Sequence, residues 1–165
     1  MLLGKPTGID DLSLNEQLII QLILQQRYAE VYELLIGREP ASTSTNYNLA
    51  LCLHWVGRYR EALNQLDLIR FAPNVTQGNK LSGNSEYMEI RNKQNLTDGH
   101  LHAVSEAYLK KFPDLVQDAV IRLKTDCWLQ LGDYSKVTAI ATPIAHKGYK
   151  NIAEALELAQ KANDK

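Results

Sequence analysis

Apolar residues recur along most of this chain at spacings of three and four positions, which is the period of an amphipathic α-helix. The stretch 14–26 shows the pattern most fully, and its apolar face is wide enough to need cover from more than one neighbour. Ser13 and Glu16 have the spacing of a capping box, so this helix is predicted to begin there. A helix over 28–36 follows, and the two form a first hairpin over about 14–37.

A second hairpin is predicted over about 45–72. Its first helix covers 45–56 and its second covers 58–71, with a glycine between them and Pro73 after them. Glycine ends helices because it adopts the left-handed conformation without strain, and proline cannot continue a helix. The hydroxyl side chains at 41–44 supply a cap for the first of these helices.

Residues 72–98 have a different character, since they are rich in Asn, Gly and Ser and their few apolar residues are scattered. Two interpretations are open. The whole stretch is an irregular insertion, or a polar loop at 74–84 precedes a short helix at 85–95. The second is favoured, because a structureless loop of 27 residues is unusual in a compact domain. In either case the insertion is a candidate lid or partner-binding loop.

The region after this insertion is predicted to be helical from a cap at Thr97 or Asp98 as far as Phe112. Pro113 ends that helix and favours the start of another. Together with the short helix before it, this segment forms a degenerate third hairpin over about 85–112.

A last hairpin is predicted over 114–146, where a long apolar helix at 114–131 is followed by a helix at 133–146. Pro143 lies inside the second helix and is expected to kink or shorten it, because proline removes one backbone hydrogen bond. A final amphipathic helix at 150–163 would cover the open end of a stack of hairpins. The pattern as a whole therefore predicts an all-α protein.

A short motif recurs at the predicted turns. Gly57 and Tyr59 are matched by Gly132 and Tyr134, each 75 residues later, and Tyr28 stands 31 residues before Tyr59. Glycine permits a tight turn, and the tyrosine ring can fill the space between the two helices that the turn joins. Three copies at these separations indicate a repeat of helical hairpins with a period of about 37 residues.

Two segments carry a resemblance to a known family, the sequence NLALCLHWVGRYREALNQLDLIRFAP at 48–73 and the sequence FPDLVQDAVIRLKTDCWLQLGDYSKV at 112–137. In their alternation of small and large residues, their Gly-x-Tyr corner and the closing proline of the first, they resemble tetratricopeptide repeats. The chain departs from the family pattern at Gln26, where glycine is usual, at Val137, where alanine is usual, and in the third hairpin, which lacks the tyrosine.

The resemblance implies an α-α superhelix, a solenoid of three to four hairpins with a C-terminal capping helix, and a single array over 1–165. It also implies that the first helix of each hairpin lines a concave groove, which receives an extended peptide or a helix of a partner protein.

Counting back from the corner tyrosines places the groove positions of the family on eight residues: Tyr47, Leu51, His54, Trp55, Arg122, Asp126, Leu129 and Gln130. The first four are mostly aromatic and apolar, as interface hot spots are, so the resemblance implies a mixed groove with an apolar centre near Trp55. The alternative for Tyr47 and Trp55 is packing between helices. The paired Lys and Asn that clamp a chaperone's terminal carboxylate in some family members are absent here.

Composition and charge exclude few other classes of protein. The 165 residues are 45% hydrophobic and 22% charged, which is enough apolar material for one core. A net charge of -1 gives no reason to expect a nucleic acid partner. No apolar run is long enough to span a membrane and no secretory signal is visible, so we expect a cytoplasmic protein. Cys52 and Cys127 have no metal-site spacing and are expected to be buried.

No nucleophile with its base, phosphate-binding glycine loop, metal-ligand cluster or paired carboxylates can be found in the sequence, so neither an enzyme nor a cofactor is expected. The predicted function is that of an adaptor, scaffold or chaperone that binds a protein or peptide. The alternatives are a secretion-type chaperone and a structural subunit that forms a homodimer through helix 14–26.

Overall fold

The computed structural model describes residues 8–72 and 84–164, which form nine α-helices and two 3₁₀ turns. Within these ranges there is no β-strand, and the prediction of an all-α protein is confirmed. The elements are α1 (Gly8–Leu24), α2 (Tyr28–Leu35), α3 (Thr43–Trp55), α4 (Tyr59–Asp67), α5 (Ser85–Gln94), η2 (Gly99–Leu101), α6 (Glu106–Lys111), α7 (Pro113–Gln130), α8 (Tyr134–Ala141), η3 (Thr142–Lys147) and α9 (Lys150–Asn163).

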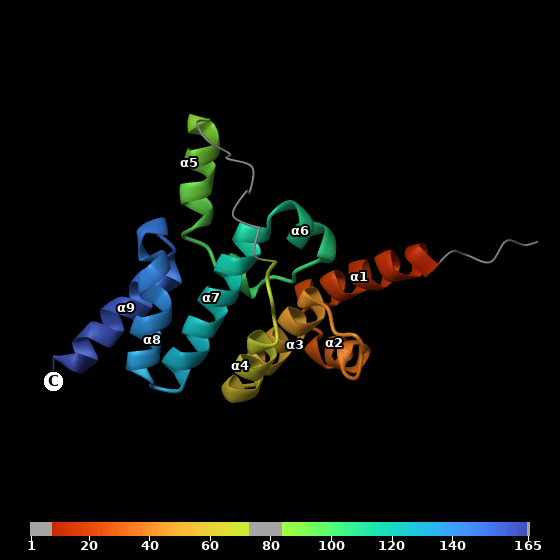
Figure 1. Cartoon of the computed structure of the whole chain (residues 1–165), viewed down its shortest axis with the longest axis horizontal. Coiled ribbons are helices and arrows are strands. Elements are labelled where there is room, and N and C mark those ends of the chain that lie inside the picture. Colours follow the sequence, from red (N-terminus) through yellow and green to blue (C-terminus); the bar gives the residue numbers. More distant parts are fainter. Residues whose placement is uncertain (1–7, 73–83, 165) are drawn as a thin grey trace, which may run out of the picture.

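Most helices pack against their neighbours in the sequence. Contacts join α1 to α2, α2 to α3 and α3 to α4, and then α7 to α8 and α8 to α9. The link between the two halves is α4 against α7, so the segment between these helices does not separate them. In Figure 1 the helices accordingly follow one another along the long axis, from α1 and α2 at one end to α8 and α9 at the other.

The turns between paired helices share one backbone geometry at three places. Gln26, Gly57 and Gly132 have left-handed φ values of 58°, 79° and 71°. In each turn the next residue donates its backbone N–H to the carbonyl five positions earlier, at 2.8, 2.9 and 3.1 Å in chain order. This bond is characteristic of a Schellman motif. A tyrosine follows in all three turns and begins α2, α4 or α8. The recurring motif predicted a tight turn before each of these tyrosines, and these turns are confirmed.

Alanine substitutions at Gly57 and Gly132 test backbone strain without steric clashes, because a Cβ at either position would meet no atom within 4 Å. We expect Gly57→Ala and Gly132→Ala each to lower the free energy of unfolding by about 1 kcal/mol, since an L-residue is strained at positive φ. Gln26→Gly should raise it by about 0.5 kcal/mol, because relief of that strain exceeds the entropic cost of glycine. Urea denaturation measures all three. Equal stability of the wild type and both alanine variants would contradict the assignment.

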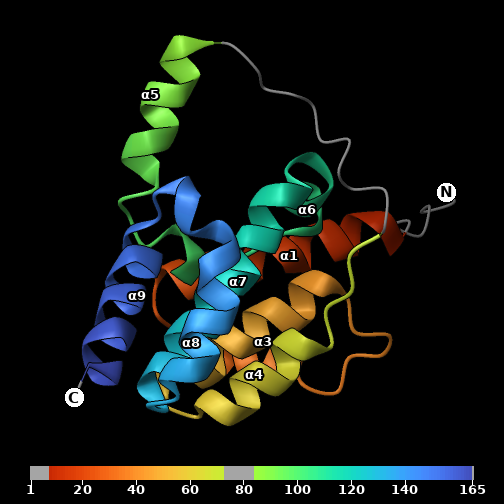
Figure 2. The same ribbon diagram turned by 60° about the vertical axis from the view of Figure 1, so that its left-hand side comes forward.

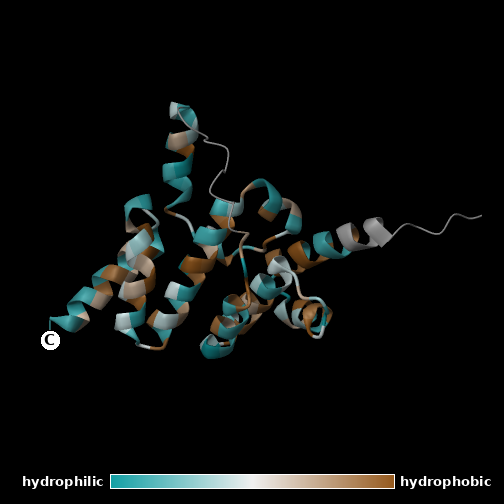
Figure 3. Ribbon diagram, in the orientation of Figure 1, coloured by the Kyte–Doolittle hydropathy of each residue, from teal (hydrophilic) through white to brown (hydrophobic). Residues whose placement is uncertain are grey.

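The main core joins the first two hairpins to α7. Its fully buried members include Leu66 of α4 and Leu123 of α7. Cys52 and Cys127 are also buried, as predicted, and burial raises the pKa of each thiol to about 12. Smaller clusters fill the contacts of α7 with α8 and α9. Figure 3 shows the same distribution, with hydrophobic segments in α1, α3 and α7 and mostly hydrophilic residues in α5.

Several predicted boundaries are confirmed. Ser42 caps α3 by accepting from the backbone N–H of Thr45 at 3.2 Å. Pro113 is the first residue of α7, where its missing N–H costs nothing. Pro143 limits α8 as expected, because the helix ends at Ala141 and continues as the 3₁₀ turn η3. Helix α9 packs against both α7 and α8.

Two predicted helix ends are wrong. Helix α1 begins at Gly8, so Ser13 lies inside the helix and not at its start. The Glu16 carboxylate instead accepts the backbone N–H of Glu106. Helix α4 ends at Asp67, well before the proline that was expected to end it. The side chain of Arg70 donates to the Asp67 carbonyl, which provides an alternative partner at the helix end.

The predicted third hairpin over 85–112 is also wrong, although its first helix exists. Helix α5 buries none of its residues and stands away from the body in both views of the ribbon (Figures 1 and 2). The helix expected from Asp98 to Phe112 is replaced by η2, an extended link and α6, which packs on α3 and α7. The loop predicted at 74–84 lies outside the described residues except for Asn84.

Candidate functional site

The groove residues predicted on α3 lie partly in the core. Tyr47 is 0% exposed and Leu51 is also buried, so the prediction that a partner contacts them is wrong. The Tyr47 hydroxyl donates to the backbone carbonyl of His100, and burial raises the pKa of this phenol. Tyr47 does face inward from α3, but a segment of the same chain covers it, and Leu51 belongs to the main core.

Asn48 holds the next part of that segment. Its Nδ2 donates to the carbonyl of Val104 at 2.9 Å, and its Oδ1 accepts the backbone N–H of Val104 at the same distance. Both residues are buried. The Asn48 amide thus pairs with both the N–H and the carbonyl of Val104. Because these backbone groups already have partners, they need none within a helix, and the chain is extended here.

The predicted groove residues on α7 are engaged in the same way. The Arg122 guanidinium is buried, and its Nη2 donates to the carbonyl of Thr97 at 2.8 Å. The Asp126 carboxylate pairs with Nε2 of His100, and its other oxygen accepts from Nδ2 of Asn151 at 2.8 Å. This face of α7 is therefore covered by residues 97–100 on one side and by the start of α9 on the other.

We call residues 97–104 the inserted segment. It contacts Tyr47 and Asn48 on α3 and Arg122 and Asp126 on α7. Three of the predicted groove residues, Tyr47, Arg122 and Asp126, thus contact the same segment, and the surface they form is filled by the chain itself. His54 lies at its border, half-buried, and burial lowers the pKa of its imidazole, with His100 acting in the same direction and Asp126 opposing it.

The last two predicted residues lie elsewhere. Leu129 is half-buried and packs with Val137, Ala155 and Ala159, in the contact of α7 with α8 and α9. Gln130 is exposed at the end of α7. Neither residue faces the inserted segment, so the prediction that they share a groove with Arg122 and Asp126 is wrong.

Trp55 is the predicted groove residue that stays accessible. It lies at the end of α3 and is 58% exposed. Its ring stacks on Tyr28, the first residue of α2, with the centroids 4.9 Å apart and an interplanar angle of 30°. The stacked rings present a continuous aromatic surface where the first two hairpins meet.

A cleft of about 630 Å³ opens beside this pair, and we call it the Trp55 cleft. Its apolar lining comes from the ends of α2 and α3, and Arg27, Glu30, Glu33 and Arg58 supply charges of both signs. Arg27 pairs with Glu30 at 2.5 Å, and the salt bridge keeps both side chains at the rim. Sequence reasoning missed Tyr28 as a site residue, although its place in the recurring motif pointed to the corner where the cleft lies.

Within the described ranges no group of three or more His, Cys, Asp or Glu side chains could hold a metal ion, and no helix is both long and apolar enough to cross a membrane. The chain matches no protein-family model, no curated protein and no solved structure. Its function is therefore inferred from the geometry of the molecule.

Proposed function

We propose that this chain is a non-enzymatic protein-binding module, a short array of hairpins of the tetratricopeptide-repeat type that holds a peptide or helix of a partner in the Trp55 cleft. The exposed Trp55–Tyr28 stack is the observation that carries this proposal. The three turns of equal geometry support the repeat architecture. The direct contact of α4 with α7 supports an array in which these two helices belong to successive hairpins and the part of the chain between them is additional to the repeats.

The chemistry of the cleft favours a protein ligand. Tryptophan and tyrosine are the residues that most often dominate interface energetics, and a stacked pair loses little entropy on binding. Val56 beside them is 57% exposed and extends the apolar surface. A rim with both charges matches a partner segment that has one large apolar side chain flanked by Lys or Arg and by Asp or Glu.

The concave face of the array is not the proposed partner site, because the inserted segment occupies it. Displacing that segment would break its hydrogen bonds with Asn48, Arg122 and Asp126, at a cost that a weakly bound peptide would not offset. An adaptor, a scaffold and a secretion-type chaperone would all use the Trp55 cleft in the same way and would differ only in the partner held.

Loss of the tryptophan ring is expected to weaken partner binding at least 10-fold, as for an interface hot spot. A partner is first identified by capture on the wild-type chain, and its purified binding segment is then titrated by calorimetry against Trp55→Ala. Val56→Asp should give a similar loss while leaving the aromatic stack in place.

Leu158→Ala is the matched control, since Leu158 of α9 is an exposed apolar residue, 48% accessible, at the far end of the molecule. Circular dichroism establishes that each variant folds. A partner that binds Trp55→Ala, Val56→Asp and Leu158→Ala with the affinity of the wild type would refute the cleft as its site.

Self-association through α1 is a second candidate, which a specific observation supports. Leu14, Leu18 and Leu24 of this helix are exposed, although Ile19 and Ile23 are buried. Two copies could cover these leucines on each other. Sedimentation equilibrium at several concentrations distinguishes the candidates, because a chain that remains monomeric excludes the homodimer and leaves the Trp55 cleft unaffected.

A further inference from the structure

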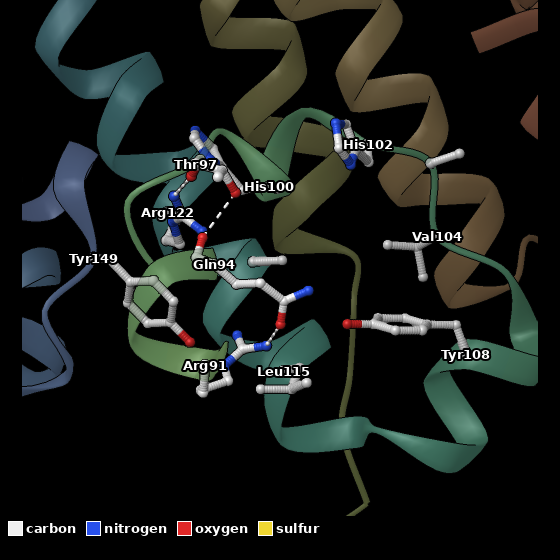
Figure 4. A pocket seen from close by; sticks show the side chains of 13 residues that line it. Arg91, Gln94, Thr97, His100, His102, Val104, Tyr108, Leu115, Arg122 and Tyr149 are labelled. Carbon is white, nitrogen blue, oxygen red and sulfur yellow. Dashed lines mark hydrogen bonds between the residues drawn. The ribbon is translucent and has the colours of Figure 1, made fainter. Parts of the chain in front are cut away.

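A second cavity, of about 300 Å³, lies where the turn after α5 and η2 meet α7, and Tyr149 closes one side of it (Figure 4). We call it the polar cavity. Its lining includes two arginines, two histidines and two tyrosines, and none of the described lining residues is Asp or Glu. Its volume is at the lower end of the range for small-molecule sites.

Arg122 brings a buried positive charge to this cavity. Its direct hydrogen bonds go to neutral oxygens, from Nε to Oδ1 of Asn151 at 2.7 Å and from Nη2 to the carbonyl of Thr97 at 2.8 Å. Among the described residues, Nη1 has no acceptor. Asp126 is linked to the guanidinium through Asn151, and the guanidinium lies over the Tyr149 ring, 4.5 Å from its centroid. Burial lowers the pKa of Arg122, and nearby groups that include Tyr149 and Asp126 oppose this shift.

His100 is a second, independent indication that the polar cavity binds a ligand. Its ring lines the cavity and is 1% exposed, and Nε2 is engaged by Asp126. The other nitrogen, Nδ1, is buried without a hydrogen-bond partner among the described residues. A buried polar atom without a partner costs free energy. Nδ1 would accept from a hydroxyl or a water if Nε2–H is donated to Asp126, and it would donate to an oxygen of an anion only as Nδ1–H.

Arg91 stands at the mouth of the cavity. It lies on α5, which buries none of its residues, and its guanidinium donates to Oε1 of Gln94 at a long 3.4 Å. Arg91 also acts on the Tyr149 phenol, where it opposes the rise in pKa that burial causes. Figure 4 shows Arg91 and Arg122 on the same side of the cavity as Tyr149. Helix α5 is polar and contributes no residue to the core, and it places Arg91 at the mouth of the cavity.

The opposite side of the cavity is less polar. Val104 and the ring of Tyr108 lie there in Figure 4, away from Arg122 and Tyr149. The lining also includes Ala119 from α7. One end of the cavity thus offers cationic donors, and the other offers Val104 and the ring of Tyr108, with the Tyr108 hydroxyl directed toward the cavity and His102 nearby.

We propose that the polar cavity binds a small amphiphilic organic anion, with its carboxylate or phosphate group between Arg122 and Arg91 and its apolar part against Val104 and Tyr108. Arginine suits this role because its planar donors match the oxygens of both anions in bidentate geometry. A cation held in a largely dehydrated site binds an anion more strongly than it would at the surface. This site is separate from the Trp55 cleft and goes beyond the protein-binding function.

Calorimetric or NMR titration with benzoate and with phenyl phosphate tests the proposal and distinguishes the two anion chemistries. Benzyl alcohol is the neutral control of similar size. We expect saturable binding of at least one anion with a dissociation constant of roughly 1 mM or lower, and binding of the alcohol at least 10-fold weaker. No saturation by either anion up to about 10 mM, or equal binding of the alcohol, would overturn the proposal.

Three variants locate the site. Arg122→Gln should weaken anion binding at least 10-fold and Arg91→Gln several-fold, whereas Arg60→Gln, an exposed arginine of α4, should leave it unchanged. Arg91→Gln keeps the test decisive if Arg122→Gln does not fold, since α5 contributes no residue to the core. Unchanged affinity in both Arg91→Gln and a folded Arg122→Gln would refute the assignment. Trp55→Ala should retain anion binding, so failure of one proposal does not imply failure of the other.

Discussion

Replacing Asp118 by alanine is expected to lower the free energy of unfolding by about 3 kcal/mol. This carboxylate is buried on α7, where it accepts from Nζ of Lys147 at 2.8 and 2.9 Å and from the hydroxyl of Tyr149 at 2.7 Å. Its loss leaves the buried Tyr149 hydroxyl without an acceptor and Lys147 without its counter-charge. Because Lys147 is 37% exposed and water can reach it, the effect lies at the lower end of the range for broken buried pairs.

Urea denaturation of Asp118→Ala measures this effect, and the chain offers a matched control. Asp67 forms a salt bridge with Lys124 at 2.6 Å, but its side chain is 65% exposed. Asp67→Ala should therefore cost less than about 1 kcal/mol. Tyr149→Phe removes one hydrogen bond and should cost about 1 kcal/mol. If Asp118→Ala were no less stable than Asp67→Ala, the buried cluster would not hold the end of η3 and the start of α9 against α7.

Asn48→Ala is expected to lower the free energy of unfolding by about 3 kcal/mol as well, through a different mechanism. The substitution leaves the N–H and carbonyl of Val104 buried and unpaired, and each such group costs about 1–3 kcal/mol. Asn48→Asp should be at least as damaging, because it places a buried carboxylate oxygen against the Val104 carbonyl.

Hydrogen exchange gives a local test of this second prediction. The Val104 amide should exchange slowly in the wild type and at least 10-fold faster in Asn48→Ala, because its only acceptor in the described structure is removed. Asn64→Ala is the control, since Asn64 is exposed on α4 and its loss should change neither stability nor exchange. Unchanged protection of Val104 in Asn48→Ala would show that the inserted segment is held by other contacts.

Features that depend on a few neighbouring residues were predictable from the sequence. The turns at Gly57 and Gly132 follow from a glycine at positive φ and a tyrosine two positions later. The long apolar run after Pro113 predicts α7, and the proline in the next helix predicts where α8 ends. Trp55 was singled out as an apolar centre by its place relative to the corner tyrosine, and it is exposed.

Errors arose where distant parts of the chain compete for the same backbone or side-chain groups. The segment before α6 has a helical pattern, but Asn48 binds the backbone of Val104 from 56 positions away. Tyr47 occupies a position that faces inward from α3, yet the carbonyl of His100, 53 positions later, covers its hydroxyl. No pattern within a single helix shows that a later insertion will fill the surface this helix presents.

The sequence by itself therefore determined the all-α class, most helices and the geometry of the turns at Gly57 and Gly132, because periodicity, glycine at positive φ and proline act within about one turn of a helix. Only the tertiary structure decided that the inserted segment fills the surface between α3 and α7, and that Tyr28 completes the stack with Trp55. These outcomes depend on contacts between residues far apart in the chain. Their free energy arises from burying and pairing specific groups together, which no local stretch of sequence encodes.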